Sequence, residues 1–297
     1  MKRPLVYIII VNWNRWQDTL DCIASCQKLV YDNAHMIVID NGSSDDSEKI
    51  LRSRLPDIEV IQSGSNLGFA GGNNIGIRLA LKRGAQYIWL LNNDTVVDSS
   101  ALGALVEPAE QDSDVGIVGS KIFYFSTPRR LWFAGGFWKF GRVQIMIRGE
   151  GEEDNALYNS IVPVDFVTGC SLLIRSETIR DIGLLEEKYF LYWEDIDWNA
   201  RAVKKGWKIL YTPHSTLWHK VSSSFHPMTD EQAYYYLRSK LLFYERHAPL
   251  MLPLSLVLVT LGALRHIAQG RMNFARGYFS GMKDYALRRF YIRTTTR

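Results

Sequence analysis

Cysteine is scarce in this chain of 297 residues, which has three, Cys22, Cys26 and Cys170, and no Cys-x-x-Cys pair. That spacing marks thioredoxin-like redox sites and many zinc sites, and an odd number of cysteines cannot pair fully into disulfides. Cys22 and Cys26 share a helix face, where we interpret them as buried apolar residues in preference to a metal or redox pair. The cysteines weakly indicate a reducing, cytoplasmic compartment.

The glycine loop of a dinucleotide-binding site is also missing. The turn after the first expected strand reads Val11-Asn12-Trp13-Asn14-Arg15. A nicotinamide-dinucleotide site needs Gly-x-Gly-x-x-Gly there, so that the pyrophosphate can approach the helix N-terminus. An NAD enzyme is therefore not expected. The glycine-rich segment at 66–73 is no P-loop either, because no Lys-Ser/Thr pair follows it.

No apolar run reaches the roughly 20 residues of a membrane span. The basic N-terminus and the apolar run at 5–11 mimic a signal peptide, but no small-residue cleavage site follows, and we interpret the run as a first strand. Residues 248–264 are uncharged and mostly apolar, but they are few and include Pro249 and Pro253. We expect this segment to lie in a membrane interface or to enter one leaflet.

The charge is distributed unevenly along the chain, whose formal net charge is +4. Residues 265–297 hold eight Arg or Lys against one acid, Asp284, which is +7 and leaves −3 for the remainder. Such a tail suggests an anionic partner, either a membrane surface or nucleic acid. Because apolar residues alternate with the basic ones at helical spacing, we favour anionic lipid and expect no nucleic acid. The alternative is a helical hairpin packed on the body or on a second copy in a homodimer.

Strands alternate with helices in the first 120 residues, which predicts an α/β fold with a mainly parallel sheet flanked by helices. We then expect hairpins and loops over 121–165 and a C-terminal helical appendage. The predicted domains are 1–228, catalytic, and 229–297, helical. Strands are expected at 5–11, 35–40, 58–62, 86–91, 164–175 and 208–211, and helices at 16–29, from Ser43, and at 70–82, 195–205 and 230–246.

Four polar residues stand at or just past the ends of apolar, strand-like runs: Asp40, Asp94, Asp195 and His219. In open α/β sheets, ligands bind beyond the carboxyl ends of the strands. Three carboxylates and an imidazole placed there suit a site that binds a nucleotide diphosphate, holds a metal and deprotonates a hydroxyl.

Several motifs follow one another within residues 5–220. They are Ile10-Val11-Asn12-Trp13-Asn14, Val38-Ile39-Asp40-Asn41-Gly42-Ser43-Ser44-Asp45, Asn66-Leu67-Gly68-Phe69-Ala70-Gly71-Gly72-Asn73, Leu91-Asn92-Asn93-Asp94-Thr95, Thr168-Gly169 and Tyr192-Trp193-Glu194-Asp195-Ile196-Asp197. In this order the motifs resemble those of family 2 glycosyltransferases, and the Asn-Asn-Asp-Thr and Trp-Glu-Asp forms resemble the rhamnosyltransferase-like branch of that family. The resemblance implies a GT-A fold, a nucleotide-sugar donor, a divalent cation and inversion at the anomeric carbon.

The resemblance assigns the nucleotide to the first part of the chain. It implies that Asp40 accepts a hydrogen bond from the ring N–H of uracil or thymine, and a carboxylate suits that imide. The alternative for Asp40 is a helix N-cap. The nucleotide-binding residues implied in this way are Asn12, Asn14, Asp40, Asn66, Gly68, Asn92 and Asn93.

The same resemblance implies that Asp94 and His219 hold a cation, Mg or Mn, at the donor diphosphate. Hard cations take oxygen ligands, and one imidazole tilts the preference toward Mn. Asn92 stands where the family's motif has its first acid, so Asp94 is the one carboxylate of the motif. The alternative for His219 is a structural histidine.

Asp195 matches the family's general base, which removes the proton of the acceptor hydroxyl, and Glu194 would contact the acceptor or hold the helix end. The alternative is capping, because carboxylates also gather at helix N-termini. Asp197 would cap the helix or pair with Arg201. Two residues are assigned to the donor sugar or the acceptor, Gly169 and Trp193, with core packing as an equal alternative for Trp193.

The expected activity is inverting transfer of a sugar from a UDP- or dTDP-sugar, with dTDP-rhamnose favoured. The acceptor would be a hydroxyl of a glycan, linked to a polyprenyl diphosphate at the cytoplasmic face of a membrane. One alternative is a nucleotidyltransferase, but the turn Asn12-Trp13-Asn14 lacks its Gly-rich basic loop. The other is a non-catalytic membrane-bound scaffold, which the joint presence of Asp40, Asp94, Asp195 and His219 argues against.

Overall fold

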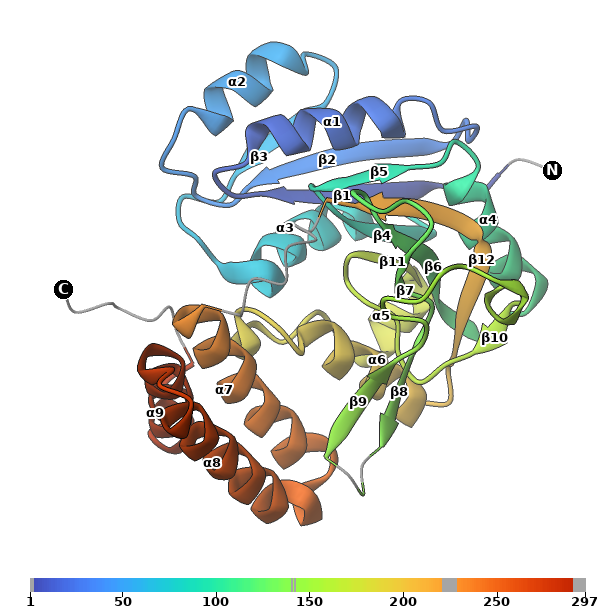
Figure 1. Ribbon diagram of the computed structural model, residues 1–297. Coiled ribbons are helices and arrows are strands. Elements are labelled where there is room, and N and C mark those ends of the chain that lie inside the picture. The colour runs from blue at the N-terminus through green and yellow to red at the C-terminus, as the bar shows by residue number, and fades with distance from the viewer. Residues whose placement is uncertain (1–2, 140, 142, 221–228, 291–297) are drawn as a thin grey trace.

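The computed structural model describes residues 3–139, 141, 143–220 and 229–290. Its centre is a ten-stranded mixed sheet, and the strands of the first half run parallel to one another (Figure 1). These strands are mostly apolar and buried, as expected for strands covered on both faces. They are β1 (Val6–Asn12), β2 (Ala34–Asp40), β3 (Glu59–Gln62) and β4 (Tyr87–Asn92).

Helices connect these parallel strands and cover both faces of the sheet, as the alternating pattern predicts. In Figure 1, the first two helices lie over one face of β1–β3 and the third lies over the other. The helices are α1 (Trp16–Cys26), α2 (Ser47–Arg54) and α3 (Gly68–Lys82).

The second half of the chain adds both parallel and antiparallel strands. Its elements are β5 (Thr95–Val97), α4 (Ala101–Gln111), β6 (Val115–Tyr124), β7 (Leu131–Phe133), β8 (Gly136–Lys139), β9 (Gln144–Ile147), η2 (Ala156–Tyr158), β10 (Val162–Pro163), β11 (Ser171–Arg175), α5 (Ser176–Ile182), η3 (Glu187–Tyr189), α6 (Glu194–Lys204) and β12 (Lys208–His219). The main path of the sheet is β10-β12-β6-β11-β4-β1-β2-β3, with β5 paired to β12 and β7 to β6. The antiparallel β11 lies between β4 and β6, whereas β6 and β12 are parallel, so the sheet is mainly parallel as predicted.

Three expected elements differ in the structure. Residues 164–175 do not form one strand, because side chains occupy part of their backbone. The amide of Asn199 hydrogen-bonds to the N–H and C=O of Val167, and the carboxylate of Asp195 accepts from the N–H of Gly169. Only β11 remains of that strand. The helix expected from Ser43 begins at Ser47, since the Ser43 hydroxyl donates to Asp40. The strand expected at 208–211 continues to His219, and the hairpin of β8 and β9 occupies the region expected to hold hairpins.

The C-terminal helices pack on the body through α7 (Asp230–His247). The fully buried Arg238 and the hydroxyl of Ser239 both donate to the carbonyl oxygen of Tyr189. Gly277 allows close approach of α9 (Met272–Ala286), because a Cβ there would collide with the backbone of Asp230. Since α7 shares the core of the body, the boundary at 228 does not coincide with a gap in packing, and it stays a prediction.

The helix between these two is the most exposed apolar element. It consists of η4 (Pro249–Met251) and α8 (Leu252–Ala268). Among the described residues, Pro249–Ala268 is one helix of 20 residues with mean hydropathy 1.8, long and apolar enough to cross a membrane. The apolar run of the sequence seemed too short because the helix also includes Arg265 and His266. Only 17% of its most apolar 18-residue window is buried, and Val257 and Leu261 are 54% and 56% exposed.

Candidate active site

The carboxyl ends of β1 and β4 open into a cavity of about 640 Å³. It contains several residues predicted to bind nucleotide, together with the predicted metal ligand Asp94. α3 and the segment before α6 form its other walls. The predicted residues that line the cavity are Asn66, Gly68, Asn92, Asn93 and Asp94.

The cavity also has walls that the sequence did not reveal. Trp13 is 52% exposed and lines the cavity from the turn after β1. The first turns of α7 close another side with Thr229, Gln232 and Tyr235. Thr229 and Gln232 form a reciprocal capping box, and that Thr-x-x-Gln spacing marks a helix start in the sequence. It does not indicate that the helix start faces a strand end more than 130 residues earlier.

Asp94 and His219 meet because β5 pairs antiparallel with the end of β12. The register places Thr95 opposite His219, so the preceding Asp94 lies beside the imidazole. The Oδ1 of Asp94 lies 3.0 Å from the Nε2 of His219. Burial would raise the pKa of Asp94, but the hydrogen bond and charge of His219 hold that pKa below its usual value. The edge of Trp132 packs on the imidazole, with ring centroids 4.6 Å apart.

Asp40 is not among the residues that line the cavity. Its carboxylate is fully buried and accepts from Asn12 Nδ2 at 2.8 Å, from Ser43 Oγ at 2.6 Å and from Gln62 Nε2 at 2.7 Å. Asn12 and Asp40 are register partners in β1 and β2. The side-chain oxygen of Asn14 accepts from the backbone of Ser44. This network fixes the turn that carries Trp13.

The turn before α3 holds Asn66 and Gly68 against the opposite wall. Asn66 Oδ1 accepts from the backbone N–H of Gly68 at 2.9 Å and from Asn41 Nδ2 at 3.2 Å. Gly68 has φ +70°, and a Cβ there would collide with the carbonyl group of Phe190. The next N–H, of Phe69, donates to that carbonyl at 2.7 Å. Glycine is therefore required where α3 touches the segment before α6.

Asp195 projects from the first turn of α6 toward the chain at Gly169. Its Oδ2 accepts from the Gly169 N–H at 2.8 Å, and its Oδ1 accepts from the Ile196 N–H at 2.8 Å. Burial raises the pKa of Asp195, although these N–H groups oppose the shift. The thiol of Cys170 has a pKa raised by burial and by the charges of Asp94 and Asp195. The carbonyl oxygen of Cys170 accepts from the Asn92 N–H at 3.0 Å, which joins this segment to the end of β4.

Trp193 and Glu194 are buried beside Asp195. Neither Trp193 Nε1 nor Glu194 Oε2 has a hydrogen-bond partner among the residues that the structure describes. Burial raises the pKa of Glu194 well above its usual value, and the charge of Asp195 adds to this. Trp193 is 2% exposed and packs on rings of α7, which supports core packing over stacking on a sugar.

A buried carboxylate, Asp197, organises the same end of α6. Its oxygens lie 2.8 Å from Arg201 Nε, 3.1 Å from the Tyr189 hydroxyl, 2.7 Å from His247 Nε2 and 3.8 Å from Arg246 Nε. These five residues are called the Asp197 cluster below. They join α6, η3 and α7, so the predicted pairing with Arg201 is one part of a larger network.

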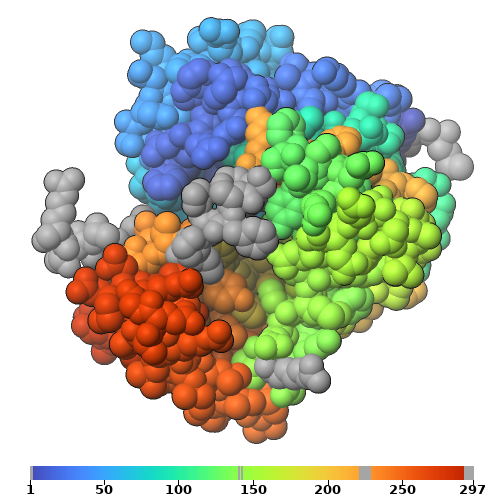
Figure 2. Space-filling view, in the orientation of Figure 1, coloured from blue at the N-terminus to red at the C-terminus, as the bar shows by residue number. Residues whose placement is uncertain are grey.

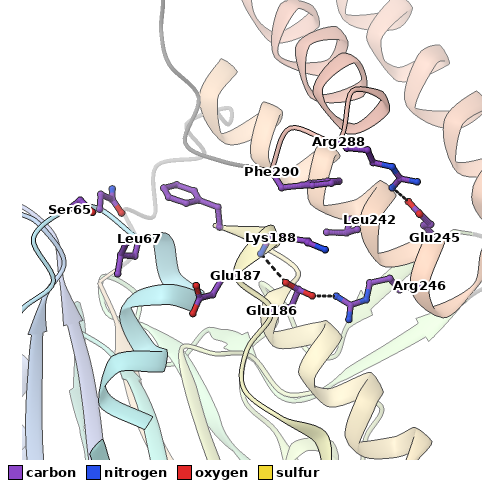
Figure 3. Close-up of a pocket in the computed structure, with 12 residues that line it drawn as sticks. Ser65, Leu67, Glu186, Glu187, Lys188, Leu242, Glu245, Arg246, Arg288 and Phe290 are labelled. Atoms are coloured by element: carbon purple, nitrogen blue, oxygen red, sulfur yellow. Dashed lines mark hydrogen bonds and ion pairs between the residues drawn. The ribbon is translucent and has the colours of Figure 1, made fainter. Parts of the chain in front are cut away.

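A second cavity, of about 970 Å³, lies between the body and the C-terminal helices (Figure 3). Four of its charged side chains form two ion pairs, Arg246 with Glu186 at 2.7 Å and Arg288 with Glu245 at 2.7 Å. Of the predicted site residues, only Asn66 reaches it. The smaller cavity is therefore the candidate site, because Asp94 lines it together with the predicted residues at the end of β4, Asn92 and Asn93.

The family model described as glycosyl transferase family 2 matches residues 7–181, which include β1–β4 and Asp94. The chain belongs to glycosyl transferase family 2.

Relatives in family 2 confirm the predicted rhamnosyltransferase-like branch. N-acetylglucosaminyl-diphospho-decaprenol L-rhamnosyltransferase of Mycobacterium tuberculosis is 25% identical over 236 residues, 72% of this chain and 75% of that protein. The dTDP-rhamnosyl transferase RfbF of Shigella flexneri is 23% identical over 268 residues, 86% of each chain. The low-salt glycan biosynthesis hexosyltransferase Agl10 of Haloferax volcanii is 28% identical over 204 residues, 66% of this chain and 60% of that protein.

Solved structures share the fold of this family 2 chain. GalNAc-T7 with UDP, GalNAc and Mn2+ matches with a TM-score of 0.66 at 16% identity, over 82% of this chain and about half, 48%, of that chain. The mannosyltransferase PcManGT of Pyrobaculum calidifontis, in complex with GDP-Man and Mn2+, matches with a TM-score of 0.60 at 11% identity, over 96% and 87%. The GT-A fold is therefore confirmed.

The Asp197 cluster predicts a pH-dependent contribution to the stability of the family 2 fold. Burial would raise the pKa of Asp197, but the hydrogen bond of His247 and the charges of Arg201 and Arg246 lower it overall. A lowered folded-state pKa gives stability that is fully present above the unfolded pKa of about 3.9 and is lost as pH falls through the folded value.

We expect Asp197→Ala to reduce the free energy of unfolding at pH 7 by roughly 3–5 kcal/mol, because it leaves the largely buried Arg201 without its carboxylate. The difference from wild type should shrink below about pH 4, where the carboxylate of the unfolded chain becomes protonated. Urea unfolding between pH 7 and 3.5 measures both effects. Asp181→Asn is the control, since Asp181 pairs with Lys205 at the surface. A loss no larger than that of the control contradicts this account of the cluster.

Proposed function

We propose that the protein transfers a sugar, with inversion, from a nucleoside-diphosphate sugar to a hydroxyl of a lipid-linked glycan. dTDP-rhamnose is the favoured donor and UDP-sugars are the alternative. The observation that carries the proposal is the carboxylate of Asp195, which accepts from the N–H of Gly169, next to the residue whose carbonyl oxygen bonds the Asn92 N–H at the end of β4. The names of two relatives support rhamnose, and one of them supports a decaprenyl-diphosphate acceptor.

The donor's base would bind in the cavity beside Trp13. The exposed indole offers a flat face for stacking, and base–aromatic stacking contributes roughly 1–3 kcal/mol. Asp40 supports this turn through Asn12 and Ser43. Since its carboxylate is already fully occupied, direct contact between Asp40 and the base would require Ser43 or Gln62 to give up its bond. The base contact of Asp40 stays a prediction.

The residues present fit a divalent cation. The Asp94 carboxylate and the His219 imidazole lie 3.0 Å apart, a separation that lets one ion contact both, and the oxygen–nitrogen donor set suits Mn. Within the described part of the chain, no three His, Cys, Asp or Glu side chains gather as a metal site, so the donor's phosphates would contribute further ligands. When bound, the cation would neutralise charge on the leaving diphosphate.

Asp195 would act as the base. As the acceptor oxygen forms its bond to the anomeric carbon, the hydroxyl proton passes to the carboxylate and the bond to the diphosphate oxygen breaks. A raised pKa matches such a proton acceptor better than an ordinary aspartate. The N–H groups of Gly169 and Ile196 each hold one carboxylate oxygen in place, and the second lone pair of an oxygen can take the proton. One displacement of this kind inverts the configuration.

A panel of UDP- and dTDP-sugars, assayed by mass spectrometry for transfer or slow donor hydrolysis, tests the proposal. A transferase should turn over at least one donor to free nucleoside diphosphate. Synthesis of a nucleotide sugar from a sugar phosphate and a nucleoside triphosphate would instead support the nucleotidyltransferase. No turnover of any kind would support the scaffold.

We expect Asp195→Asn to lower kcat by roughly 10²–10⁴, because the amide cannot accept the proton. Donor affinity should stay within about twofold, since the base acts on the acceptor. Steady-state kinetics and donor titration measure these effects, with Glu177→Gln as a control at an exposed carboxylate. Turnover equal to that of wild type would remove Asp195 from the base role.

We expect Asp94→Ala and His219→Ala to weaken nucleotide binding in Mn2+ or Mg2+, but not in EDTA. The reason is that both side chains would act through the cation. Calorimetric titration with UDP and dTDP measures this, and His214→Ala is the control because His214 is exposed on the same strand. Full activity in excess EDTA, or equal effects of His219→Ala and His214→Ala, would contradict the cation site.

The exposed face of α8 would hold the enzyme on the cytoplasmic face of a membrane, as a peripheral protein. Its exposed side chains include Val257, Leu261 and Leu264, and Leu250 of η4 is exposed beside them. Residues 265–297, which follow, carry +7, and each basic residue near an anionic leaflet contributes roughly 1 kcal/mol. Apolar burial and charge attraction would therefore act together.

We expect Leu261→Gln with Leu264→Gln to reduce binding to phosphatidylglycerol vesicles by roughly tenfold or more, because two leucine side chains lose apolar burial. Salt should loosen the wild type only in part, since it screens charge alone. Vesicle co-sedimentation measures this, with Val30→Gln and Leu157→Gln as exposed apolar controls on the body. If the wild-type protein stays in the supernatant with every lipid, the exposed face of the helix is a packing or dimerisation surface instead.

A further inference from the structure

One face of α7 lies directly against the residues that precede Asp195. Tyr236, Lys240 and Tyr244 are spaced by four along the helix, so their side chains are neighbours on that face. The ring of Trp193 lies 5.6 Å from that of Tyr236 and 6.1 Å from that of Tyr244. Lys240 therefore lies between two rings that contact Trp193. Trp193 itself stands two positions before the proposed base, Asp195.

Lys240 lacks a carboxylate partner in the part of the chain that the structure describes. It is partly buried, and its Nζ lies 5.9 Å from the ring centroid of Tyr244. Burial lowers its pKa, and no neighbouring acid opposes the shift. The residues outside the described ranges, 1–2, 140, 142, 221–228 and 291–297, include no Asp or Glu. The positive charge of this side chain is thus uncompensated.

The aromatic side chains around Lys240 carry further hydrogen-bond donors that lack acceptors. Trp193 Nε1 is buried and has no partner within the described ranges. The hydroxyls of Tyr236 and Tyr244 bond to no residue that the structure describes. Burial raises the pKa of Tyr236, and the charge of Glu150 adds to this. Within the described ranges, no acceptor bonds to the donors of this cluster, which consists of Trp193, Tyr236, Lys240 and Tyr244.

We propose that this donor cluster binds a phosphate of the acceptor, with Lys240 as its cationic centre. The proposal rests on the proposed function and extends it to a site for the acceptor. Lysine binds phosphate as a point charge, and hydroxyl and indole N–H groups complete such a site. A phosphate held here would leave the linked sugar next to Asp195.

The position of α7 also suits a lipid-linked phosphate. Lys240 lies about two turns before the end of α7, after which the chain continues into the exposed apolar α8. Figure 2 shows a hollow between the orange and red C-terminal helices and the green segment, on the side where the chain of α7 lies. A lipid tail could therefore extend from the donor cluster along α8.

Binding of decyl diphosphate tests the site without enzyme activity. The titration is done in EDTA with excess UDP and dTDP, so that the donor cavity does not contribute. We expect Lys240→Met to weaken binding roughly ten- to hundredfold and Lys240→Arg to keep most of it. Tyr236→Phe with Tyr244→Phe keeps both rings and should weaken binding severalfold. Lys283→Met, an exposed lysine on α9, is the charge-matched control and should bind as wild type.

Several outcomes would overturn the site. These are no binding by wild type, equal affinities of wild type and Lys240→Met, or equal losses in Lys240→Met and Lys283→Met. Inorganic diphosphate in place of decyl diphosphate should show the same dependence on Lys240. If phosphatidylglycerol vesicles instead show that dependence and decyl diphosphate does not, the cluster binds phospholipid headgroups and the acceptor assignment is wrong.

Kinetics separate this proposal from the proposed function. The acceptors are decyl-diphosphate-linked N-acetylglucosamine and decyl N-acetylglucosaminide, which differ only in the diphosphate. Lys240→Met should raise KM for the first roughly tenfold or more and leave kcat and the second acceptor unchanged. Equal changes for both acceptors would reject the phosphate site alone. A wild-type enzyme that glycosylates neither acceptor and turns over no donor would reject the proposed function, while the binding result still decides the phosphate site.

Discussion

The geometry of the site depends on the hydrogen bonds and ion pairs of the buried Asp197 carboxylate. A buried charge is costly unless it is paired, and here the partners come from η3 and α7 as well as from α6 itself. Arg201 also donates to the carbonyl oxygens of Ile182 and Leu184, which fixes the segment after α5. The three elements must therefore pack together for this end of α6 to be stable, and Asp195 lies two residues away in the first turn.

The same cluster explains how the segment before α6 holds an unfavourable backbone. Phe190, Tyr192 and Trp193 have φ values of 62°, 66° and 72°, in the left-handed region that side chains other than glycine rarely adopt. Such residues cost of order 1–3 kcal/mol each and persist where the surroundings determine them. Tyr189 and Asp197 hold the two ends of this segment through one hydrogen bond. This backbone conformation places Asp195 against Gly169 and buries Trp193 against α7.

The sequence predicted the parts of the site that depend on parallel strands. Apolar runs of strand length ended at Asp40 and Asn92, and carboxyl ends of parallel strands meet at one edge, so the cavity was expected there. Periodicity did not reveal β5, which has three residues, although its pairing with β12 brings Asp94 to His219. Nor could it decide between stacking and packing for Trp193, because the covering rings lie more than 40 positions later. The roles of these residues in binding and catalysis stay predictions.

α7 links the parts of the molecule that the sequence suggested were separate. Its first turns line the cavity of the candidate site. The face with Tyr236, Lys240 and Tyr244 carries the hydrogen-bond donors described above. Its buried side packs on α9 at Gly277 and Gly281. Tyr234, for example, donates to Asp284 of α9 at 2.8 Å. A chain cut after α7 would expose Tyr234 and the fully buried Arg238, and it would disturb the wall of the donor cavity. The exposed apolar surface of α8 is thus built on the same helix that shapes the site. Its contribution has to be separated by substitutions on that exposed face, because removal of the C-terminal helices would also remove contacts of α7.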